Sequence, residues 1–147
     1  MINYMLEKDI IGTWKMESWT YEDESGQELD YLDKDSSGIL HYTSIGLMSV
    51  QIMKGGRKKF VSGELLNGTV EEIQSAFSSF FAYYGKYQVS DENVLTHQIE
   101  GSNFPNWVGE KEIRYADLKE DNLVLSAPST LPDGTSVTFR VRWRRAT

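Results

Sequence analysis

Hydrophobic and polar residues alternate along most of the chain, which is the pattern of strands with one buried face. The segments that show it are residues 10–21, 38–43, 47–54, 86–89, 94–100, 112–119, 123–127 and 137–144. Turn-forming residues separate them, as in Ser44-Ile45-Gly46 and Pro132-Asp133-Gly134. The pattern therefore predicts a mainly β protein, with about eight to ten short antiparallel strands in a sandwich or a closed barrel.

One segment, residues 70–84, has the period of an α-helix instead. Thr69 and Glu72 have the spacing of a capping box, and Gly85 has the conformational freedom to end the helix. Apolar residues recur at three- and four-residue steps, namely Ile73, Phe77, Phe80, Phe81 and Tyr84. Because such a face is costly to leave in water, we expect this helix to cover a barrel mouth, with Phe77, Phe80 and Phe81 turned inward. It would be either a plug that completes the core or a lid over a ligand cavity.

Length and composition point to one domain spanning residues 1–147. The chain is 39% hydrophobic, and it contains no repeat or linker. No apolar run approaches the ~18 residues of a membrane span. The absence of cysteine excludes a disulfide framework and a thiolate metal site. The amino-terminal residues lack the layout of a secretory signal, so we expect a cytoplasmic location.

The acidic charge is concentrated at one end of the chain. The formal net charge is −7, and residues 1–35 carry all of it, with ten acidic and three basic side chains. The remaining residues are neutral in sum. A chain with this distribution has no general attraction for a polyanion, so we expect no nucleic-acid partner.

A series of motifs resembles a known family. Gly12-Thr13-Trp14 matches the G-x-W of lipocalin-type barrels. It is followed by a Gly-Ile-Leu-His-Tyr-Thr strand, a glycine turn, a Leu-Met-Ser-Val-Gln strand, and an aromatic helix that ends in Tyr-Tyr-Gly. A strand with Thr96-His97 and the segment Phe104-Pro105-Asn106-Trp107-Val108-Gly109 come next. This order, which covers nearly the whole chain, resembles the small bacterial lipocalin-like domain family of calycin-type barrels.

The resemblance implies a barrel around an interior cavity. Trp14 would plug the closed end, with an arginine of the final strand across its ring. That strand offers Arg142, Arg144 and Arg145, and we expect Arg142 or Arg144 to lie beside Trp14.

Strand alternation selects the residues that would face the cavity. Leu95, His97 and Ile99 share one face, so we expect His97 to point inward, with Tyr87 of the preceding strand as its neighbour. A buried imidazole needs partners for both ring nitrogens. His97 is either a core residue bonded to a tyrosine or a carbonyl, or a ligand-contacting or catalytic group.

Two further positions stay open. Arg114 shares a face with Ala116 and Leu118; if that face is internal, the cation needs an acid, a ligand anion or an aromatic stack. The other register places Arg114 in solvent. Trp107 either caps the barrel end or borders a binding-site entrance, where Asn106 would present its amide to a ligand.

The functional hypotheses follow from this cavity. No nucleophile elbow, phosphate-binding loop, HExxH or dinucleotide fingerprint is present, and two histidines fall short of a three-histidine metal site, so we expect no metal and no cofactor.

The first hypothesis is the binding of a small hydrophobic or amphipathic molecule. Its candidate ligand contacts are His97, Tyr87, Arg114, Asn106, Trp107, Phe77 and Phe81. The alternatives are a small cofactor-independent isomerase, cyclase or decarboxylase that uses His97, Tyr87 and Arg114, or a filled barrel that serves as an interaction module. The pattern does not determine the oligomeric state.

Overall fold

The structure is a computed structural model that describes residues 7–146. Its strands are β1 (Gly12–Glu22), β2 (Glu28–Asp30), β3 (Ser37–Tyr42), β4 (Leu47–Met53), β5 (Phe80–Val89), β6 (Val94–Ser102), β7 (Lys111–Lys119), β8 (Asn122–Thr130) and β9 (Ser136–Arg145). Its helices are the 3₁₀ turns η1 (Glu7–Ile10) and η2 (Pro105–Trp107) and the α-helix α1 (Val70–Ser78). None of the helices in this part of the chain is long and apolar enough to cross a membrane.

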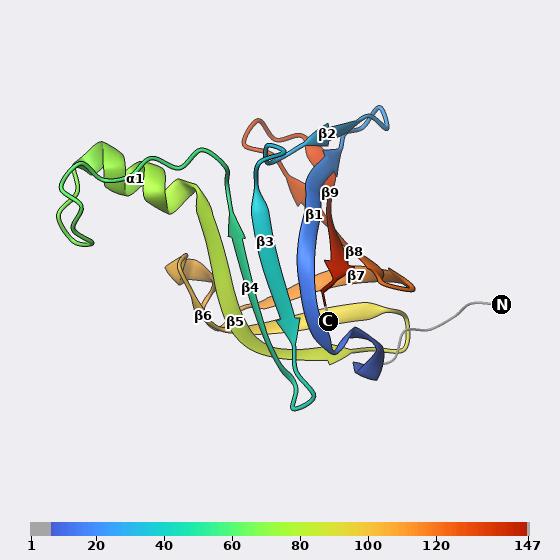
Figure 1. Cartoon of the computed structure of the whole chain (residues 1–147). Coiled ribbons are helices and arrows are strands. Elements are labelled where there is room, and N and C mark those ends of the chain that lie inside the picture. Colours follow the sequence, from blue (N-terminus) through green and yellow to red (C-terminus); the bar gives the residue numbers. More distant parts are fainter. Residues whose placement is uncertain (1–6, 147) are drawn as a thin grey trace.

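Eight of the strands form a closed antiparallel barrel. Strands β3 to β9 pair in chain order, and β1 pairs with both β3 and β9, which closes the ring (Figure 1). The short strand β2 adds to β1 beyond the part that pairs with β3. Closure gives every barrel strand a hydrogen-bonded neighbour on both sides. The predicted mainly β barrel is therefore confirmed.

Trp14 fills one end of the barrel. It is fully buried, and its indole Nε1 donates a hydrogen bond to the carbonyl of Ile10 at 2.9 Å. The guanidinium of Arg145 lies 4.3 Å from the centre of the Trp14 ring, and it donates to the carbonyls of Ile11 and Asp9. The burial of Trp14 and its arginine neighbour agree with the implication of the family resemblance.

The identity of that arginine differs from our expectation of Arg142 or Arg144. The antiparallel register of β1 and β9 places Arg145 opposite Trp14. Arg145 shares the inner face of β9 with the buried Trp143, because alternate residues of a strand point the same way. Arg142 lies on the other face, where it pairs with Glu28 at 2.6 Å.

The predicted helix is shorter than expected. The capping box of Thr69 and Glu72 is present, but α1 ends at Ser78, and Phe80 to Tyr84 belong to β5. This strand pairs with β4 on one side and β6 on the other, and aromatic residues fit such a pleated surface well. Gly85 lies at a bulge in β5, where an added Cβ would overlap the carbonyl oxygen of Gln98. Glycine at this position therefore allows β5 and β6 to approach closely, and it does not end a helix.

The helix stands beside the barrel instead of crossing its mouth. Figure 1 shows α1 projecting away from the tops of β4 and β5. No residue of α1 is buried, and Phe77 is 52% exposed. Phe80 lies under the guanidinium of Arg57, 5.4 Å from the ring centre, and only Phe81 of the three phenylalanines lines the interior. Phe77 and Phe80 thus differ from the inward orientation that the helical period predicted.

Candidate functional site

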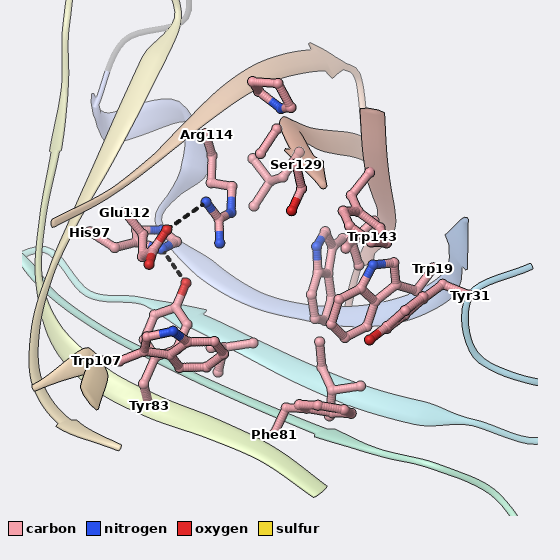
Figure 2. Close-up of a pocket in the computed structure, with 17 residues that line it drawn as sticks. Trp19, Tyr31, Phe81, Tyr83, His97, Trp107, Glu112, Arg114, Ser129 and Trp143 are labelled. Carbon is pink, nitrogen blue, oxygen red and sulfur yellow. Dashed lines mark hydrogen bonds and ion pairs between the residues drawn. The ribbon is translucent and has the colours of Figure 1, made fainter. Parts of the chain in front are cut away.

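The barrel encloses a cavity of about 380 Å³. Its wall has an aromatic part, formed by Trp19, Tyr31, Phe81, Tyr83, Trp107, Phe139 and Trp143. Its polar side chains are His97, Glu112, Arg114 and Ser129. Figure 2 shows His97, Glu112 and Tyr83 on one side of the space, with Trp107 beside Tyr83, and Trp19, Tyr31 and Trp143 on the other side.

The aromatic side is built by residues of β1, β5 and β9 and by Tyr31, which follows β2. The Trp19 ring lies 5.0 Å from Tyr31 and 5.5 Å from Phe81, measured between ring centres. Phe139 lies 4.9 Å from Tyr31, almost perpendicular to it. These tilted and edge-to-face contacts hold the rings together in one apolar surface.

His97 is at the centre of the polar side. It is 2% exposed, and its Nε2 lies 2.7 Å from the hydroxyl of Tyr42 while its Nδ1 lies 2.6 Å from the hydroxyl of Tyr83. Burial, aided by the positive charge of Arg114, lowers the pKa of His97 to about 3. The imidazole is therefore neutral at physiological pH, with one nitrogen as donor and the other as acceptor.

Arg114 adopts the inward register, one of the two alternatives that the sequence left open. Glu112, Arg114 and Ala116 face the interior, whereas Ile113 and Tyr115 are each about half exposed. The acid that a partly buried cation needs is Glu112, which lies 3.3 Å from the guanidinium and two residues earlier on the same face.

Tyr83 connects His97 with the open space of the cavity. Burial raises the pKa of its hydroxyl to about 12, and the charge of Arg114 opposes that rise. The Tyr83 hydroxyl is therefore protonated at neutral pH and available as a hydrogen-bond donor. Trp107 stands edge-on to Tyr83, with ring centres 6.0 Å apart.

The cavity brings together four of the seven predicted contact residues, His97, Arg114, Trp107 and Phe81. Tyr87 lies opposite His97 as expected, but its hydroxyl donates to the carbonyl of Thr43 at 2.6 Å, and the residue is outside the cavity lining. Phe77 and Asn106 are exposed and also outside it.

Sequence reasoning missed Tyr42, Tyr83 and Glu112. Tyr83 alternates with Phe81 along β5, but the assignment of this segment to a helix hid that pattern. Tyr42 lies on a strand whose two faces are equally apolar, so alternation gave no direction. Glu112 had a usable signal, because it precedes Arg114 by two residues and so shares its face.

No cluster of three or more histidine, aspartate or glutamate side chains within residues 7–146 has the arrangement of a metal site.

Two comparisons place the chain among known proteins. Residues 11–146 match the family described as the Lipocalin-like domain. The 4'-hydroxy-3'-methoxypropiophenone carrier protein ppsC of Aspergillus oryzae is 34% identical over 106 residues, which cover 67% of this chain and 96% of that protein. Because the family match spans most of the chain, the chain belongs to the lipocalin-like domain family.

Proposed function

We propose that this protein is a carrier that binds a small, single-ring aromatic molecule inside its barrel. The observation that carries the proposal is the cavity itself, of about 380 Å³, with a rigid aromatic side and one polar cluster. Pockets of roughly 300–1,000 Å³ with few polar groups are typical of small-molecule sites. The similarity to a protein named as a carrier of a substituted propiophenone supports an aryl ketone as the first compound to test.

The enzymatic alternative has less support from the geometry. Both ring nitrogens of His97 are engaged by tyrosine hydroxyls, so neither is free to reach a substrate. A base with a pKa of about 3 also has little tendency to accept a proton at neutral pH. Binding is therefore the function that we propose.

The direct test is a titration with 4'-hydroxy-3'-methoxypropiophenone, followed by calorimetry and by tryptophan fluorescence. Three of the four tryptophans line the cavity, so a ligand bound there should quench the emission. Ala127→Trp places an indole in the cavity and is expected to abolish binding. Ser126→Trp is the matched control. Ser126 directly precedes Ala127 on β8, so its side chain points to the outer face of the strand. Equal binding to both variants would contradict the proposal.

A second pair of variants tests which phenylalanine belongs to the site. Phe81→Ser removes apolar surface from the cavity wall and is expected to raise the Kd of the same ketone about tenfold. Phe77→Ser changes a half-exposed residue of α1 outside the cavity, so it should change the Kd by less than about twofold. A larger effect of Phe77→Ser on the Kd would indicate that α1 is part of the binding site.

A further inference from the structure

The hydrogen bonds of His97 determine the direction of the Tyr83 hydroxyl proton. A neutral imidazole carries one N–H, so two arrangements are possible. In the first, Tyr42 donates to Nε2, and Nδ1–H donates to the oxygen of Tyr83. In the second, Tyr83 donates to Nδ1, and Nε2–H donates to the oxygen of Tyr42.

The burial of Tyr42 selects the first arrangement. Tyr42 is 1% exposed, and His97 is the hydrogen-bond partner of its hydroxyl within the described residues. The second arrangement would leave the Tyr42 proton buried without an acceptor, which is strongly unfavourable. In the first arrangement, the Tyr83 oxygen accepts from His97, and its own proton is left to point away from the imidazole. Since Tyr83 lines the cavity, a molecule inside can accept this proton.

Arg114 is a second hydrogen-bond donor of the cavity wall. The Arg114 guanidinium carries five N–H groups, and its ion pair engages the nearby carboxylate of Glu112. Tyr83 and Arg114 are therefore two donors of the wall that a bound molecule can reach.

Building on the carrier function proposed above, we propose that the cavity recognises its ligand through an acceptor oxygen, the carbonyl oxygen of an aryl ketone. The Tyr83 hydroxyl donates to this oxygen, with the Arg114 guanidinium beside it. Tyr42 and His97 are positioning residues that hold Tyr83 in the donor role. The aromatic ring of the ligand then lies on the opposite side of the cavity, against Trp19 and Tyr31 (Figure 2).

The tautomer of His97 is the first test, and it leaves the residues of the cavity unchanged. The chain has two histidines, so a ¹⁵N-histidine-labelled sample gives two sets of ring signals, which His41→Asn assigns. We expect His97 to carry its proton on Nδ1 and to have an unprotonated Nε2 from pH 5 to pH 8. A proton on Nε2 would overturn the proposed role of Tyr83.

The second test compares two ligands that differ only at the carbonyl. These are 4'-hydroxy-3'-methoxypropiophenone and 2-methoxy-4-propylphenol, in which a methylene replaces the carbonyl. We expect the ketone to bind the unmodified protein about tenfold more tightly, as is typical of one well-made hydrogen bond in a buried site. Tyr83→Phe should abolish this preference, and Tyr42→Phe should reduce it. Tyr84→Phe is the matched control, because Tyr84 is adjacent on β5 and 57% exposed, and it should retain the preference.

The outcomes separate the two proposals. If both compounds bind equally, and Tyr83→Phe changes neither affinity, the inference about the acceptor oxygen is wrong while the carrier function stands. If neither compound binds, the carrier function proposed for single-ring aromatic molecules fails, and the inference falls with it.

Discussion

Replacement of Trp14 by alanine should lower the free energy of unfolding by about 3–5 kcal/mol, the usual range for a large aromatic residue in a core. Trp14 is fully buried, its Nε1–H is bonded to the Ile10 carbonyl, and Arg145 stacks on its ring. The variant loses all three interactions and leaves a cavity at the closed end of the barrel. Urea denaturation followed by circular dichroism measures the difference.

Two further variants divide this effect into its parts. Trp14→Phe keeps an aromatic ring under Arg145 but removes the indole N–H, so we expect a smaller loss of about 1–2 kcal/mol. A double-mutant cycle with Arg145→Met isolates the stacking of the guanidinium on the ring, for which we expect about 0.5–2 kcal/mol. A loss below about 1 kcal/mol for Trp14→Ala would contradict the role of Trp14 as the plug.

Acidification from pH 7 to pH 5 should destabilise the protein by about 2 kcal/mol through His97 alone. Burial lowers the pKa of His97 from its ordinary value of 6.5 to about 3 in the folded state. Between these two values the unfolded chain binds a proton that the folded protein does not, so the unfolded state gains stability as the pH falls. The contribution of the neutral imidazole is thus fully present above pH 6.5 and is lost towards pH 3.

The control for this prediction is His97→Gln, which keeps a polar side chain but does not titrate. Urea denaturation of both proteins at pH 7 and pH 5 gives the difference, and the contributions of the carboxylates cancel because both proteins contain them. The loss of stability in the unmodified protein should exceed that in the variant by about 2 kcal/mol. Equal losses would show that His97 titrates in the folded protein as it does in the unfolded chain.

The structural features that were predicted correctly are those with a strong local pattern of apolar and polar residues. Strict alternation located the strand of His97 and its inward direction, because a period of two has one buried face. The same logic failed at Phe81 and Tyr83, since aromatic residues there also recur at helical steps. Pairing with β4 and β6 decided between the two periods, and these partners are distant in the sequence. The choice between Arg142, Arg144 and Arg145 likewise depended on the register between β1 and β9.

The sequence by itself determined the mainly β architecture, the capping box of α1 and the inward direction of His97. Each of these depends on the order of side chains within a few residues, which the chain encodes locally. Only the tertiary structure decided that Tyr42 and Tyr83 meet at His97, 55 and 14 residues away. It also decided the inward register of Arg114. These features depend on which strands become neighbours when the barrel closes, and local periodicity carries no information about that pairing.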